Sequence, residues 1–151
     1  MPAFQVFHAA TNTASTTVPM LSLMATATSQ IGIYDIESGS DASADNAVKY
    51  AIRRVSARGT QSATVTPTAS DQNVTQAALT TCDTAWNINP TITASSDLRV
   101  WAHHQRGSVR WMAYDYTKFL RSQAGTGKGF ALMSVVVSSA FNGVWSLSFD
   151  E

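Results

Sequence analysis

Charged side chains are scarce in this chain of 151 residues. Only 13% of the residues are Asp, Glu, Lys or Arg and the formal net charge is zero, whereas about 25% charged residues is usual for a soluble domain. A neutral chain has no bulk electrostatic attraction to nucleic acid or to an anionic membrane, so we expect neither as a partner. Because charge is depleted where subunits pack together, this composition favours a protein that covers much of its surface with partners.

Cysteine, a basic leader and long apolar runs are also missing. The single cysteine, Cys82, excludes an intrachain disulfide framework and a cysteine-based zinc site. The opening stretch MPAFQVFHAATNT has neither a basic leader nor a long apolar run, so we expect no signal peptide. No segment approaches the ~18 consecutive apolar residues of a membrane span. These absences predict a protein that stays in a reducing, cytoplasm-like compartment or leaves it within a particle.

Recognisable catalytic and metal-binding patterns are absent as well. His103 and His104 are adjacent in an expected strand, so their side chains face opposite sides and cannot share one metal ion. The glycine-rich stretch Gly125–Gly129 is not a P-loop, because Ser122 stands where the first glycine is required and Gly129 where a Ser or Thr is required. We interpret it as a mobile loop with one exposed lysine. The sequence therefore predicts no enzyme, no metal and no other cofactor.

What the chain does contain is a strand pattern that is clearest between Val48 and Pro67. The first half alternates apolar and polar residues, as a half-buried strand does. Arg53 and Arg54 are adjacent and must face opposite sides, and Arg58 precedes a turn at Gly59. Since arginine forms bidentate pairs with carboxylates, we predict that these three arginines contact a protein outside the subunit.

Further strands follow from the same alternation. The candidates are residues 4–7, 18–28, 31–36, 91–93, 97–104, 109–114, 130–139 and 144–149. Asn142-Gly143 predicts a hairpin turn between the last two, and a turn at Arg106-Gly107 predicts that 97–104 and 109–114 are partner strands. Asp71–Cys82 contains helix formers and predicts one or two helical turns. The pattern indicates an all-β protein, an antiparallel sandwich or barrel of jelly-roll type with a short helical patch.

The N-terminus is predicted to be an arm. Phe4 and Phe7 belong to a small apolar group, and the small polar residues Ala10–Thr17 behind it form a linker long enough to reach a neighbour. We therefore expect an arm over residues 1–17 that packs on another subunit or on a shell, followed by a single β domain over residues 18–151.

Aromatic residues gather in the second half of the chain. Trp101 and Trp111 flank the turn at Arg106-Gly107, and Tyr114 follows them. Such a cluster is typical of a sugar-binding platform, of a contact between subunits, or of the subunit's own core. The sequence leaves these three interpretations open.

One long segment carries a resemblance. The stretch IYDIESGSDASADNAVKYAIRRVSARGTQSATVTPTASD resembles a pattern in small structural proteins of tailed bacteriophages, in which a strand ending in a Gly/Asp loop precedes an Asp-Asn-Ala stretch and a Gly-Thr turn. The matching positions are Asp45-Asn46-Ala47, Tyr50, Arg53 or Arg54, Gly59-Thr60, Thr66-Pro67, Gln105-Arg106, Arg110-Trp111 and the closing acidic residue Glu151.

The resemblance is to head decoration, or cement, proteins, and it carries functional expectations. It implies a jelly-roll-like protein made in the host cytoplasm that binds the capsid exterior as a homotrimer, with the major capsid protein and its own copies as partners. The expected contact residues are Phe4, Phe7, Arg53, Arg54, Arg58, Trp101, Arg110 and Trp111. The alternative is a carbohydrate- or receptor-binding β module of a phage tail that uses the aromatic cluster.

Overall fold

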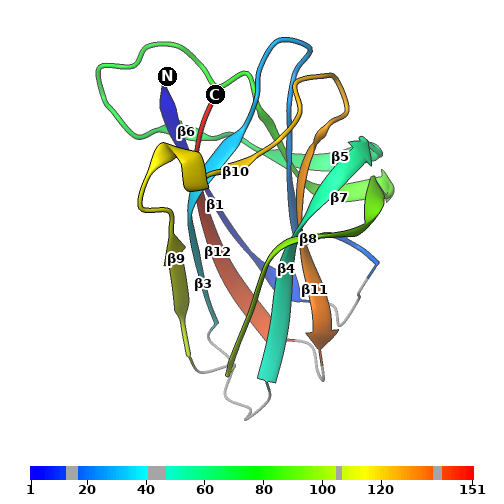
Figure 1. Ribbon diagram of the computed structural model, residues 1–151. Coiled ribbons are helices and arrows are strands. Elements are labelled where there is room, and N and C mark those ends of the chain that lie inside the picture. The colour runs from blue at the N-terminus through cyan, green and yellow to red at the C-terminus, as the bar shows by residue number, and fades with distance from the viewer. Residues whose placement is uncertain (13–16, 41–46, 105–106, 138–140) are drawn as a thin grey trace.

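Two antiparallel sheets of six strands each form the molecule, and they pack against one another as a sandwich (Figure 1). The computed structural model describes residues 1–12, 17–40, 47–104, 107–137 and 141–151. Within this part of the chain the only helical turn is a short 3₁₀ turn, η1, at Tyr116–Lys118. The predicted all-β antiparallel sandwich is confirmed.

The two sheets interleave segments that lie far apart in the sequence. The first sheet has the order β10 (Leu120–Arg121), β3 (Gly32–Ser40), β12 (Phe141–Asp150), β1 (Ala3–Asn12) and β6 (Thr68–Ala69), with β9 (Val109–Met112) also paired to β3. The second has the order β5 (Thr60–Val65), β7 (Thr81–Ile88), β2 (Leu21–Met24), β11 (Gly129–Val137), β4 (Ala47–Ala57) and β8 (Thr91–His104).

The pairing of these strands is that of a jelly roll. The first strand pairs with the last, β1 with β12, and the second with the next to last, β2 with β11. Inside them β3 pairs with β9 and β10, and β4 pairs with β8. This nested pairing is what results when one long antiparallel ribbon is wrapped into two sheets. Strands β5 and β7 continue the β4–β8 ribbon beyond its bend, since Val65 lies opposite Cys82.

Alternation along the strands builds the core between the sheets. In β12 the side chains of Trp145, Leu147 and Phe149 are fully buried, while the residues between them are half-exposed. Tyr50 of β4 meets Trp145 edge to face from the opposite sheet, at 5.8 Å between ring centroids. The period of two predicted for the stretch 144–149 therefore places its large side chains as expected.

The predicted N-terminal arm is wrong for residues 3–12. These residues form β1, which lies inside the first sheet between β12 and β6. Phe4 and Val6 are each 1% exposed, and the ring of Phe4 stacks on that of Phe149 at 5.9 Å. The apolar group looks too small to stand alone only because its partner, the inner face of β12, lies at the other end of the chain.

The predicted hairpin at Asn142-Gly143 is also wrong. Both residues lie within β12, opposite Thr11 and Ala10 of β1, and β11 belongs to the other sheet. Gly143 does not have a positive φ. A Cβ atom at this glycine would approach the Trp145 ring to 2.4 Å. The glycine therefore makes room for a core indole and does not form a type I′ turn.

Two further local expectations fail. Strands β8 and β9 are not partners, because β8 pairs with β4 and β9 with β3, and residues 105–106 of the predicted turn lie outside the described residues. The segment before β7 forms turns and no helix, so the predicted helical patch within Asp71–Cys82 is wrong. The backbone N–H groups of Leu79 and Thr80 donate hydrogen bonds to the Glu151 carboxylate at 2.6 and 2.7 Å, so they are not available for hydrogen bonds within a helix.

Candidate functional site

Two of the residues predicted to contact partners belong to the core. Phe4 is buried in the first sheet, and Trp101 is only 8% exposed. The Trp101 indole N–H donates to Ser38 Oγ at 2.9 Å, which ties β8 of one sheet to β3 of the other. The assignment of both residues as external contacts is wrong, because period-two alternation buries these positions.

Three of the predicted arginines are paired with carboxylates of the same subunit. Arg58 donates to both oxygens of Asp83 at 2.9 and 2.6 Å, and the Asp83 side chain is fully buried. Arg53 donates to Asp97 at 2.5 Å. Sequence reasoning missed these acids because they follow 25 and 44 residues later. A carboxylate on another protein is therefore not needed to neutralise either arginine.

Arg110 forms the same kind of fork at the surface of the first sheet. Its guanidinium donates to both oxygens of Asp35 at 3.1 and 2.7 Å across the β3–β9 pair. The hydrogen bond and the negative charge of Asp35 raise the pKa of Arg110. The Arg110 side chain keeps 59% of its exposure, so the ion pair is open to solvent and to a partner.

Phe7 and Trp111 keep the accessibility that a contact residue requires, to different degrees. Phe7 is 59% exposed on the outer face of the first sheet. Trp111 is half-buried, with the Arg99 guanidinium 5.4 Å from its ring centroid. Trp111 is thus already partly covered by a cation from the neighbouring edge strand.

The outer face of the first sheet carries further apolar residues that sequence reasoning missed. We define this outer face by Gln5, Phe7, Glu37, Met112, Val144 and Ser146. Met112 is 51% exposed, and a shallow hollow of about 270 Å³ lies beside Phe7 and Val144. Only the register of β1, β3, β9 and β12 brings these residues together, although each one occupies the outward phase of its own strand.

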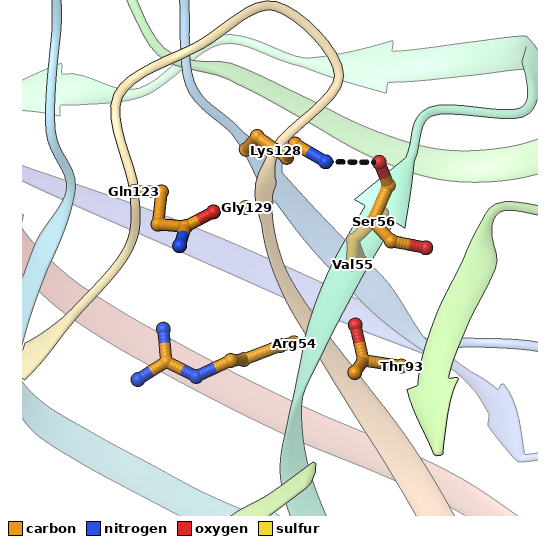
Figure 2. A pocket seen from close by; sticks show the side chains of 7 residues that line it. All are labelled: Arg54, Val55, Ser56, Thr93, Gln123, Lys128 and Gly129. Carbon is orange, nitrogen blue, oxygen red and sulfur yellow. Dashed lines mark hydrogen bonds between the residues drawn. The ribbon is translucent and has the colours of Figure 1, made fainter.

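A second hollow lies where β4 and β11 meet the chain before β11. Figure 2 shows Arg54, Ser56, Thr93, Gln123 and Lys128 around it, and its volume is about 190 Å³. The Arg54 guanidinium donates from Nη1 to the backbone oxygen of Arg121 at 3.0 Å. The Lys128 ammonium donates to the backbone oxygen of Ser56 at 2.9 Å. We call this site the Arg54–Lys128 hollow.

The segment that presents Lys128 is a hydrogen-bonded turn, and the expectation that its lysine is exposed is wrong. Gly125 and Gly127 have φ values of +138° and +82°, which glycine adopts without strain. The Gly125 N–H donates to Thr26 O, and the Lys128 N–H donates to Gly125 O, each at 3.0 Å. Lys128 is half-buried as a result.

The Arg54–Lys128 hollow is positively charged. No Asp or Glu lines it. In the described part of the chain neither Arg54 nor Lys128 forms an ion pair, whereas Arg53, Arg58 and Arg110 do. Two cations without a carboxylate form a site that can accept an anion.

Two observations on the described residues concern metal ligands and the one thiol. They contain no group of three or more His, Cys, Asp or Glu side chains that could hold a metal ion. Burial raises the pKa of the Cys82 thiol to about 12, with smaller contributions from the charges of Asp83 and Glu151. The thiol is therefore protonated near neutral pH, and the thiolate is the form that acts as a nucleophile.

Comparison with family models, with curated proteins and with solved structures finds no match to this chain. In the part of the chain that the structure describes, no helix has the length and apolarity needed to cross a membrane.

Proposed function

We propose that this protein is a virion structural protein that decorates the outside of a tailed-phage head as a homotrimer, with the major capsid protein as its main partner. The observation that carries the proposal is the outer face of the first sheet, where Phe7 and Met112 are 59% and 51% exposed. Aromatic residues and Met are enriched at protein interfaces. The jelly-roll pairing is consistent with the proposal, because this fold recurs in viral capsid domains, although fold alone does not decide function.

Self-association has its own support in the second sheet. Strand β8 is an edge strand that pairs only with β4 among the described residues, and most of its residues, including Val100, are exposed. A long exposed edge is prone to pair with another chain unless it is covered. A closed ring of three copies covers such surfaces without propagating into a fibre.

The test measures binding to expanded heads that lack the protein. Phe7→Asp and Met112→Asp should each lower the affinity for heads at least ~30-fold if these side chains are interface hot spots of 2 kcal/mol or more. Ile88→Asp is the matched control, since Ile88 is 65% exposed but lies on β7 of the other sheet. Light scattering should report three chains per particle. A monomer that never binds expanded heads contradicts the proposal.

A carbohydrate- or receptor-binding module of a phage tail stays as a second candidate. Trp101 is buried and so drops out of the aromatic cluster that this candidate requires, but Tyr114 is 97% and Tyr116 53% exposed. Exposed aromatic rings are the surfaces on which sugar rings can pack. Saturable binding on a glycan array that Tyr114→Ala abolishes, together with no binding to heads, favours this candidate over decoration.

A further inference from the structure

We propose that the Arg54–Lys128 hollow is a binding site for a small oxyanion of the phosphate type. The proposal does not depend on the decoration function. It rests on two cations that line one hollow without a carboxylate, on the donors that they leave unused, and on the hydrogen-bonded turn that holds one of them.

The strands fix the positions of both cations. Gly129 at the start of β11 lies opposite Val55 of β4, and Phe130 lies opposite Arg54, so Lys128 and Arg54 flank the Gly129–Val55 pair on either side. A Cβ atom at Gly129 would lie 2.0 Å from Leu23 O, so only glycine permits this close approach of β11 to β2. The turn before Gly129 therefore presents Lys128 at a defined place on the edge of the hollow.

Both cations have donors to spare. A guanidinium carries five N–H donors and an ammonium three. Arg54 uses Nη1 for Arg121 O, and Lys128 uses one N–H for Ser56 O. In Figure 2 the Gln123 amide lies above the Arg54 guanidinium, and Thr93, which also lines the hollow, lies on the other side of β4. Charged and neutral donors thus line the hollow together, as an oxyanion requires.

Electrostatics favours an anion in the hollow. A cation removed from water is costly unless an anion accompanies it. Arg53, Arg58, Arg110 and Arg121 each have an aspartate for this purpose. The half-buried Arg54 and Lys128 have only backbone oxygens among the described residues, which carry no formal charge. Phosphate and sulfate carry more negative charge than acetate into a hollow lined by two cations, so we expect them to bind more tightly than acetate.

The test is a titration of the full chain with inorganic phosphate, sulfate and acetate at low ionic strength, followed by amide chemical shifts and calorimetry. Saturable phosphate shifts should centre on the residues around Arg54 and Lys128. Lys128→Gln should weaken phosphate binding at least ~10-fold, which corresponds to about 1.4 kcal/mol. Thr93→Asp should abolish it, because it places a carboxylate in the hollow at an exposed position that should tolerate the change.

The matched control is Lys118→Gln, which removes the same charge from the exposed 3₁₀ turn η1, outside the hollow. It should leave phosphate binding unchanged. Absence of saturable shifts at tens of millimolar phosphate overturns the proposal, as does an equal loss in the control variant. Tighter acetate than phosphate binding would overturn the assignment to a tetrahedral dianion. Thermal melting of each variant confirms that it is folded, and Thr93→Asp still tests the site if Lys128→Gln does not fold.

Discussion

The ion pair between Arg58 and Asp83 offers the sharpest test of whether the arginines on and after β4 stabilise the subunit or bind a partner. The Asp83 side chain has no exposed surface, and Arg58 retains 27% of its exposure. Two hydrogen bonds at 2.9 and 2.6 Å join them. Replacing Arg58 with Met removes the cation and leaves a buried carboxylate without its counter-charge.

The expected loss of stability follows from that burial. Removing one partner of a buried ion pair costs ~3–5 kcal/mol. Because Arg58 is partly exposed and water can enter its place, we expect the lower end, about 3 kcal/mol. For a chain of this length each kcal/mol shifts the melting temperature by about 2–4 °C. Arg58→Met should therefore melt about 6–12 °C below the parent chain.

Urea unfolding of three variants makes the test specific. Arg110→Met breaks a fork of the same geometry with Asp35, but Arg110 is 59% exposed, so this variant should lose far less stability. The double variant Arg58→Met with Asp83→Asn removes the buried charge as well as its partner. It should be more stable than Arg58→Met alone, since the cost comes from the unpaired carboxylate.

The opposite pattern would refute this reasoning. If Arg58→Met unfolds at the same urea concentration as the parent chain and only weakens attachment to heads, then Arg58 is a contact residue as the sequence suggests. If the double variant is less stable than Arg58→Met, desolvation of the Asp83 carboxylate is not the source of the loss.

Three other predictions concern the core and its thiol. Deletion of residues 2–12 should unfold the protein, because it removes β1 with Phe4 and Val6 from the first sheet, and circular dichroism of the truncated chain checks this. The folded-state pKa of Cys82, about 12, lies above its ordinary value of 9.0. The free energy of unfolding should therefore fall as the pH rises from 9 to 12, by up to ~1.4 kcal/mol per pH unit. Cys82→Ala should lose this pH dependence, and a Cys82→Ala profile identical to that of the parent chain would contradict the prediction. Gly143→Ala should lower the melting temperature through its clash with Trp145, whereas Gly39→Ala, where the nearest atom to a Cβ is 3.8 Å away, should be tolerated better.

The sequence predicts local geometry well where one strand suffices as evidence. Alternation in β4 and β12 places Tyr50 and Trp145 on the opposite side from their polar neighbours, and both are buried. The absence of βαβ spacing and the many short strands indicate a jelly roll, and the nested pairing confirms it. These inferences succeed because side-chain direction in a strand repeats every two residues whatever the partner strand is.

Most of the expectations that fail depend on contacts between segments that are far apart in the sequence. Phe4 looks like part of a free arm until β12, more than 130 residues later, is placed beside it. Asn142-Gly143 is a strong hairpin signal, yet here the glycine is needed for another reason. Its missing Cβ leaves room for the indole of Trp145, two residues further on. Local propensity carries no information on such contacts, and tertiary packing overrides it.

The partners of the arginines also could not be predicted from local sequence, and Arg54 differs from the paired arginines. A chain with ten cations and ten anions has zero net charge, but that balance does not reveal which charges meet. The fold brings Arg53, Arg58, Arg110 and Arg121 to aspartates that lie far away in sequence. This pairing removes the original reason to assign Arg53 and Arg58 to an external contact. It leaves Arg54, which lines a hollow together with Lys128, as a half-buried cation that no carboxylate in the described part of the subunit neutralises, and for that reason this hollow is where an anion should bind.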